Sequence, residues 1–230
     1  MKSTAKLSCE ERRAAIIKAV RRVFAEKGFH GTTTRELAEA AEVSEALLFK
    51  HFPNKEALYS AMMLSCCQEK DEGMCGRLMA LEPSASTLVL MVHLLASHML
   101  MRQPAGKDND APQVRLMLRS MLEDGEFARL FLEGMTAHWV RKVEECVKAA
   151  VAAGDAVDGP VRPSLRGWFA NDLFAMLLIH LSPAKPVVDY EMSREKLVEQ
   201  AVWFALRGMG LKEEAIKRYY NPKALALFGH

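Results

Sequence analysis

The sequence TTRELAEAAEVSEALLFKHF at residues 33–52 decides the fold of the N-terminal part of this chain. It opens with a threonine followed three residues later by a glutamate, which is a capping box and predicts the start of a helix. Ala38 is small enough for two helices to cross closely, and Val43 can plug a short turn into the core. Leu48 and Phe52 give the second helix a buried side and leave its other side exposed. The stretch therefore predicts a helix-turn-helix, whose second helix can enter the major groove of DNA.

Further helices are expected on both sides of this stretch. Another capping box begins at Ser8 and opens a helix that ends at the run Gly28-Phe29-His30-Gly31. Ser44 can cap the second helix of the helix-turn-helix through its hydroxyl group. Pro53 and the residues after it begin a fourth, long helix that passes Cys66. The N-terminal segment is thus a three-helix domain followed by a longer helix.

In the rest of the chain, apolar residues recur at intervals of three and four, which is typical of helices. The expected helices lie near residues 84–101, 111–123, 126–153, 164–181, 194–209 and 212–220. No alternating strand pattern and no internal repeat occurs. We therefore predict an all-α protein of about nine to ten helices. Residues 1–55 would form the helix-turn-helix domain, and residues 56–230 a larger helical domain.

Composition excludes several classes of protein. Half of the 230 residues are hydrophobic, which is ample for a packed core. The longest apolar run, from Trp168 to Leu181, contains Asn171 and Asp172 and is shorter than the roughly 18 residues of a membrane span. The N-terminus leads into charged residues rather than an apolar signal core, so we expect a cytoplasmic protein with no membrane partner. The five cysteines lack CxxC spacing, which suggests free thiols in a reducing compartment: Cys9, Cys66, Cys67, Cys75 and Cys146.

The net charge of +2 is unevenly distributed. Residues 1–55 hold 11 Lys/Arg against 7 Asp/Glu, a net charge of +4, and the remaining residues hold 20 against 22, a net charge of −2. A basic N-terminal domain on a nearly neutral body is what binding to the phosphates of DNA would require.

A longer string carries a family resemblance. GFHGTTTRELA at residues 28–38, AEVS at 41–44 and LFKHFPNKEAL at 48–58 resemble the N-terminal domain of TetR-family repressors. The resemblance is strong over residues 10 to about 60; the remainder matches in helical content and length. It implies a homodimer that binds a palindromic operator in double-stranded DNA. It also implies release when a small-molecule effector occupies the C-terminal domain. A repressor is the expected role, and an activator stays open.

The resemblance also assigns DNA contacts. Thr33 and Thr34 would lie against a phosphate, with Arg35 reaching the backbone or a base edge. Lys55 would hold a phosphate through its charge and its backbone N–H. The recognition helix would offer Ser44, Glu45, Ala46, Leu47, Phe49, Lys50 and His51. Two of these have alternatives, because Phe49 could belong to the core and His51 could be an ordinary surface histidine.

The reading face departs from the family pattern. Glu42 stands where the family usually has glycine, and a left-handed conformation there would cost roughly 1–2 kcal/mol. Phe49 replaces a frequent tyrosine, so a phosphate hydrogen bond is lost. Ala46 and Leu47 replace glycine and threonine. Leu47 suits a thymine methyl group, Lys50 a guanine and Glu45 a cytosine amino group. An operator taken from a relative is therefore not expected to apply.

The C-terminal domain is rich in methionine. All 14 methionines except Met1 lie beyond residue 55, and their flexible side chains suit an adaptable apolar pocket, although ordinary core packing explains any single one. His93 and His98 add polar groups that could orient a ligand. The residues predicted to line a pocket for a hydrophobic effector are Cys66, Met99, Met117, Met121, Phe131, His138, Trp139, Trp168 and Asn171.

The last two long helices carry apolar faces joined by a short connection. In the family such a pair forms the dimer interface with its symmetry mate. The resemblance therefore assigns the interface to Leu173, Leu177, Leu181, Leu197, Ala201 and Phe204.

The sequence allows three other functions to be compared with a ligand-responsive repressor. A metal- or thiol-responsive regulator on the same scaffold is one alternative, but the cysteines and histidines lack CxxC and HxxxH spacing, so no metal and no cofactor is expected. An enzyme is not expected, because GxSxG, GxxxxGK[ST], HExxH and GxGxxG are all absent. A helical scaffold or adaptor without DNA binding would leave residues 33–55 unexplained.

Overall fold

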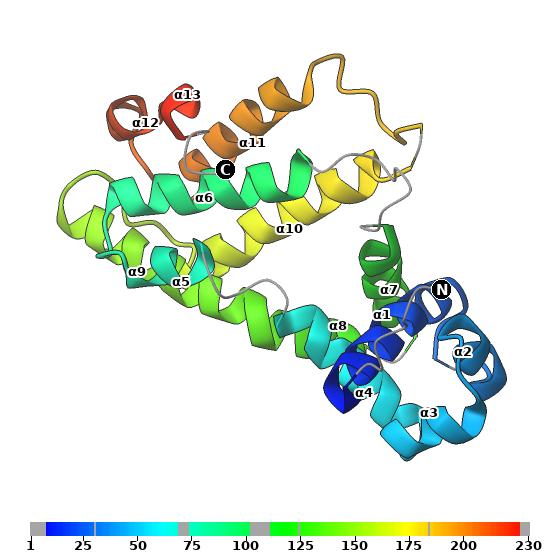
Figure 1. Cartoon of the computed structure of the whole chain (residues 1–230). Coiled ribbons are helices and arrows are strands. Elements are labelled where there is room, and N and C mark those ends of the chain that lie inside the picture. The colour runs from blue at the N-terminus through cyan, green and yellow to red at the C-terminus, as the bar shows by residue number, and fades with distance from the viewer. Residues whose placement is uncertain are drawn as a thin grey trace, which may run out of the picture. The chain divides into compact units, whose positions relative to one another are not determined.

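The computed structural model describes residues 8–29, 31–68, 74–101, 111–123, 125–183 and 185–225. These residues form thirteen α-helices, one π-helical turn, η1 (Leu132–Thr136), and no β-strand; a single isolated bridge pairs Ala156 with Leu211 (Figure 1). The all-α prediction is confirmed. The helices outnumber those expected because two are short and were not predicted, α5 (Met74–Ala80) and α13 (Pro222–Leu225), and because the predicted 126–153 helix is divided by η1.

The chain divides into two compact units. Unit 1 comprises Met1–Lys70 and Asp110–Leu132, and unit 2 comprises Asp71–Asn109 and Glu133–His230. A segment from the middle of the sequence thus packs in the same unit as the N-terminal helices. The boundary between residues 55 and 56, drawn from the sequence, stays a prediction.

Unit 1 is built around the N-terminal helix-turn-helix. Its helices are α1 (Cys9–Lys27), α2 (Thr34–Ala40), α3 (Glu45–His51), α4 (Lys55–Gln68), α7 (Ala111–Leu122) and α8 (Glu126–Phe131). The predicted capping box of α1 is present, because Ser8 Oγ accepts from the Glu11 N–H and Glu11 Oε2 accepts from the Ser8 N–H. Phe24 is fully buried and meets the ring of Tyr59 edge-on at 4.9 Å. The core therefore joins α1 to α4.

Helix α7 supports the end of α1. Arg119 Nη1 donates to the Glu26 carbonyl at 2.7 Å, and Arg119 Nε pairs with Glu123. Gly28 follows with φ 71°, and a Cβ there would lie 2.5 Å from Arg119 Nε. The left-handed backbone favours glycine at this position, and a Cβ would also force the Arg119 side chain to shift.

The turn between α2 and α3 is a Schellman motif with a glutamate in the position that favours glycine. The Val43 N–H donates to the Ala38 carbonyl at 3.0 Å, and the Glu42 N–H donates to the Glu39 carbonyl at 3.1 Å. Glu42 has φ 53°, in the left-handed region. The turn therefore keeps its shape and carries the backbone strain of a side chain there.

Replacing Glu42 by glycine is expected to stabilise unit 1. Relief of left-handed strain contributes about 1–2 kcal/mol, and the greater freedom of glycine in the unfolded chain offsets about 0.4–1 kcal/mol. A net gain of about 0.5–1 kcal/mol should appear in urea unfolding followed by circular dichroism. Glu42→Ala keeps the Cβ while removing the carboxylate and should show no such gain. An equal gain in both variants would assign the effect to charge rather than to strain.

Unit 2 is a helical bundle with α6 in the middle. Besides α5 and α13, its helices are α6 (Ala85–Leu100), α9 (Ala137–Ala152), α10 (Pro163–Leu181), α11 (Arg194–Gly208) and α12 (Glu213–Tyr219). Figure 1 shows α6 running beside α10 and α11, and α6 also packs on α9. Leu88, Val92 and Phe174 are fully buried in its core. No helix among the described residues has the length and apolarity that a membrane crossing demands.

Arg166 connects the loops at one end of unit 2 through hydrogen bonds. Arg166 is 4% exposed and donates to the carbonyls of Val161 at 2.8 Å and Met209 at 3.0 Å. Beside it, Gly210 has φ 95°, and a Cβ there would lie 2.7 Å from the Val157 carbonyl oxygen. This arrangement joins the start of α10 to the end of α11.

Candidate nucleic-acid interface

The helix-turn-helix is shaped by hydrogen bonds that its own sequence supplies. Thr33 Oγ1 accepts from the Glu36 N–H at 3.3 Å, and Glu36 Oε2 accepts from the Thr33 N–H at 2.8 Å. Ser44 Oγ accepts from the Leu47 N–H at 3.2 Å. Both predicted caps are therefore confirmed. The hydroxyl groups of Thr33 and Ser44 are used to begin α2 and α3 in the free protein.

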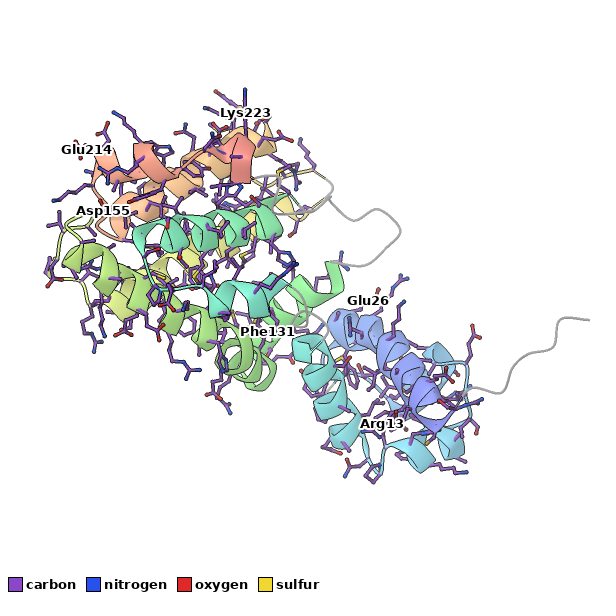
Figure 2. All side chains as sticks on the ribbon, turned by 60° about the vertical axis from the view of Figure 1, so that its left-hand side comes forward. Arg13, Glu26, Phe131, Asp155, Glu214 and Lys223 are labelled. Carbon is purple, nitrogen blue, oxygen red and sulfur yellow. The ribbon has the colours of Figure 1, made fainter. Side chains whose placement is uncertain are left out.

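Helix α3 is held against α1 by its C-terminal end. Leu48 and Phe52 are buried, and the guanidinium of Arg13 lies 4.1 Å from the centre of the Phe52 ring. Arg13 Nη1 also donates to the His51 carbonyl at 2.6 Å. Arg13 lies on α1 toward the end opposite Glu26 (Figure 2). A cation–π contact and a hydrogen bond from Arg13 thus help the buried Leu48 and Phe52 to hold α3 against α1.

The outer side of α3 is open. Ala46, Phe49 and Lys50 are exposed, Phe49 to 41%, whereas Leu47 and His51 are half-buried. Phe49 therefore lies on the surface and not in the core. His51 Nδ1 lies 3.8 Å from the Cys9 thiol, so its ring is placed between α3 and the start of α1. This exposed side is the surface that a helix-turn-helix offers to the major groove.

The first residues of α2 and α3 interact across the motif. Thr34 Oγ1 donates to Glu45 Oε2 at 2.9 Å. Arg35 Nε pairs instead with Glu39 Oε1 at 2.9 Å, and the arginine is largely exposed. The predicted DNA contacts Thr34, Arg35 and Glu45 thus lie together at one edge of the helix-turn-helix.

Lys55 begins α4, as the sequence predicted, but its side chain is engaged within the protein. Its Nζ donates to the Thr32 carbonyl at 2.6 Å and lies 4.4 Å from the centre of the Phe29 ring. The lysine therefore fastens the turn that leads into α2. Its role at a DNA phosphate stays a prediction.

An ion pair fixes the capping box of α2 to α1. Lys27 Nζ bonds to Glu36 Oε1. This bond, together with the N–H and hydroxyl groups of Thr33, lowers the pKa of Glu36 to about 2. The carboxylate accordingly stays ionised, and the capping box stays intact, across the physiological pH range.

Positive charge lies on α1 rather than on the helix-turn-helix. Between residues 34 and 51 four glutamates outnumber Arg35 and Lys50, a net charge of −2. Helix α1 carries six Lys/Arg against three Glu, a net charge of +3. In a complex with DNA, attraction to the phosphates would therefore come largely from α1, and the carboxylates on α2 and α3 would oppose non-specific binding.

The predicted effector residues are divided between the two units. In unit 1, Met117 and Phe131 pack against the core of the helix-turn-helix, and Met121 is 55% exposed. In unit 2, Met99 and Trp139 pack against the main core. The structure does not gather the set into one site within either unit, and the pocket stays a prediction.

The other predicted effector groups differ in exposure. His138 is exposed and bonds through Nδ1 to the Gly134 carbonyl, and Trp168 and Asn171 are half-buried. His93 is buried beside the Tyr220 hydroxyl, and burial lowers the pKa of its imidazole, so it is neutral in the core.

The structure describes the side chains of two cysteines, Cys9, which is exposed, and Cys146, which is buried. The side chains of Cys66, Cys67 and Cys75 lie outside the described residues. Burial raises the pKa of the Cys146 thiol, which is therefore protonated and unreactive. No group of three or more potential metal ligands occurs among the residues that the structure describes.

The predicted dimer residues lie along α10 and α11 and differ in exposure. Phe204 is exposed and Leu173 is half-buried, whereas the other four belong to the buried core of unit 2: Leu177, Leu181, Leu197 and Ala201. Leu173, Leu177, Leu197, Ala201 and Phe204 line one shallow hollow of about 510 Å³, together with Gln200, Trp203 and Arg207. Leu181 lines a neighbouring hollow with Leu197. Phe204 is 72% exposed beside the other apolar side chains of this hollow.

Several residues that support the helix-turn-helix carry no recognisable signal in the sequence. Arg13, Arg119 and the Lys27–Glu36 pair all join elements that are separated in the sequence. Each is an ordinary charged residue on a helix, and no local pattern distinguishes it from a solvated one. Only the packing of α1 against α2, α3 and α7 reveals their roles.

The N-terminal segment is similar in sequence to known bacterial regulators. The family described as "Bacterial regulatory proteins, tetR family" matches residues 16–62. "HTH-type transcriptional regulator RutR" of Escherichia coli (strain K12) is 42% identical over 65 residues, which cover 27% of this chain and 31% of RutR. The chain thus matches less than a third of the length of such relatives, within the helix-turn-helix region.

Solved structures extend the likeness to the whole fold. AibR, crystallised with isovaleryl coenzyme A and operator DNA, is 22% identical with a TM-score of 0.60, over 84% of this chain and 97% of that one. NalD, described as the secondary repressor of a multidrug efflux pump in Pseudomonas aeruginosa, is 18% identical with a TM-score of 0.61, over 90% of this chain and 100% of that one. At these identities the likeness establishes the fold.

Proposed function

Because the chain belongs, through its helix-turn-helix domain, to the tetR family of bacterial regulatory proteins, we propose that it is a repressor that binds a palindromic operator as a homodimer. The observation that carries the proposal is the exposed outer side of α3 in a fully capped helix-turn-helix. Two such helices related by a two-fold axis can enter successive major grooves about 34–36 Å apart. The apolar surface on α10 and α11 supports a dimer with that symmetry.

We further propose that a small, hydrophobic effector releases the operator. Methionine-rich composition in the C-terminal part supports an apolar ligand. Two structural relatives support a small-molecule effector: AibR, crystallised with isovaleryl coenzyme A, and the flavonoid-responsive regulator FrrA. Release requires that the effector bind more tightly to a conformation whose recognition helices do not fit the two half-sites. Linkage is reciprocal, so operator DNA must then weaken effector binding by the same factor.

Selection of binding sites from random double-stranded DNA tests the DNA-binding proposal. We expect a two-fold symmetric site to be enriched, with an affinity that falls steeply as salt rises. Lys50→Ala should lower affinity for the selected site by about 5- to 150-fold, the contribution of one good base contact. Lys148→Ala, a matched change on α9, should leave the affinity unchanged. Failure of the wild-type protein to enrich any sequence would overturn the proposal.

A further inference from the structure

The recognition helix begins with a carboxylate whose position is fixed. Glu45 is the first residue of α3, is exposed, and accepts a hydrogen bond from Thr34 Oγ1 at 2.9 Å. Arg35, the cation on α2, forms its ion pair with Glu39 and also attracts the Glu45 carboxylate at longer range. The carboxylate is thus neither buried nor used in that ion pair. It stands at the end of α3 that approaches base edges when a recognition helix enters the major groove.

We propose that Glu45 determines specificity by accepting a hydrogen bond from a cytosine amino group in each operator half-site, with Thr34 as its positioning residue. The inference rests on the proposed function, since it needs α3 to lie in the major groove. It deepens that function by assigning one base of the operator to one side chain.

Cytosine follows from the groups that the bases present in the major groove. A carboxylate can only accept, so it requires a donor there. Cytosine presents its N4 amino group alone, whereas adenine presents an N7 acceptor beside its N6 amino group, and guanine and thymine present acceptor oxygens. The carboxylate is attracted by the cytosine donor and repelled by the acceptors of the other bases.

The charge of the motif makes this selection sharper. The helix-turn-helix has a net charge of −2 between residues 34 and 51, so Glu45 adds repulsion close to the DNA. Unless the carboxylate meets a donor, it weakens binding to every sequence. The same carboxylate therefore favours one base and penalises sites that lack it.

The hydroxyl group of Thr34 orients the Glu45 carboxylate. Its hydroxyl group donates to one carboxylate oxygen and leaves the other, Oε1, to meet the base. Since side chains of exposed glutamates are otherwise free to rotate, this hydrogen bond reduces the entropy lost when the base contact forms. Removal of the Thr34 hydroxyl group should weaken the preference for cytosine without creating a preference for another base.

Site selection with matched variants tests the assignment. The wild-type protein should prefer cytosine over thymine at one position of each half-site by about 5- to 150-fold. Glutamine pairs with adenine through N6 and N7, so Glu45→Gln should lose that preference and gain adenine at the same position. Thr34→Val should keep cytosine with a smaller ratio. Glu56→Gln, which removes an exposed carboxylate at the start of α4, should keep the full cytosine preference.

The outcomes separate this inference from the proposed function. If the wild-type protein enriches a palindrome and Glu45→Gln enriches the same bases at every position, Glu45 is not a base reader and the inference fails alone. Enrichment of a base other than cytosine at the only position altered by Glu45→Gln overturns the cytosine assignment. If the wild-type protein enriches nothing, the proposed function itself fails. Circular dichroism of each variant establishes that a changed preference is not a loss of fold.

Discussion

Replacing Phe204 by aspartate is expected to leave a folded monomer that binds the operator at least 100-fold more weakly. Phe204 projects from α11 into solvent, 72% exposed, beside Leu173 and Ala201. In a dimer formed by this surface, the aspartate and its symmetry mate would be buried without partners. A monomer contacts one half-site only, and the loss of linked binding lowers affinity by about 10²–10⁴-fold.

Two measurements check this result. Light scattering at micromolar concentration gives the mass of the protein, and fluorescence anisotropy gives its operator affinity. Leu122→Asp is a matched control, because Leu122 is 87% exposed on α7, in unit 1. It should leave both the mass and the affinity unchanged. A Phe204→Asp protein that remains dimeric would place the dimer interface elsewhere.

The α10–α11 surface also shows why periodicity predicts helices better than interfaces. The sequence assigns Leu197, Ala201 and Phe204 to one interface, yet Leu197 and Ala201 are buried in the core of unit 2 while Phe204 is exposed. Apolar residues that pack within the chain and apolar residues that pack against a partner recur at the same intervals along a helix. Only the packed structure separates them, by leaving Phe204 outside the core.

The helix-turn-helix could be predicted because its determinants are local. Capping boxes, the buried pair Leu48 and Phe52, and the strained Glu42 all follow from residues within a few positions of one another. The supporting contacts are not local. Arg119 bonds to the Glu26 carbonyl although the two residues are 93 positions apart in the sequence, and no pattern near either residue predicts the contact.

The predicted effector pocket shows what composition cannot predict, namely which side chains lie close together. Methionines and aromatic residues were grouped by composition, which contains no spatial information. Met117 and Phe131 belong to unit 1, whereas Met99 and Trp139 belong to unit 2. A pocket requires convergence of side chains, and a shared preference for apolar surroundings does not supply it.

Replacing Arg166 by methionine is expected to destabilise unit 2 by about 3–6 kcal/mol, because two short hydrogen bonds from a charged group, each worth about 1.5–3 kcal/mol, are lost. Its guanidinium supplies donors to the carbonyls of Val157, Gly159, Val161 and Met209. Methionine fills similar space but donates nothing, so these oxygens lose their partner inside the protein. The bond from Arg166 to Asp158 adds little, because the Asp158 side chain is 79% exposed.

Urea unfolding followed by tryptophan fluorescence measures this loss. All three tryptophans, Trp139, Trp168 and Trp203, lie in unit 2, so their emission follows that unit. Asp158→Asn is the control and should shift stability by less than about 0.5 kcal/mol. Arg166→Lys keeps the charge with fewer donors, so its stability should lie between those of Arg166→Met and Asp158→Asn. A methionine variant as stable as the wild-type protein would show that backbone hydrogen bonds alone hold these loops.

The position of Arg166 links this stability to function. Its partners lie just before α10 begins and just after α11 ends, and these two helices carry the surface proposed for the dimer. Loosening the loops should let the two helices shift, so the Arg166→Met protein should also dimerise more weakly than Asp158→Asn. A variant that is less stable yet dimerises normally would separate the loop contacts from the dimer surface.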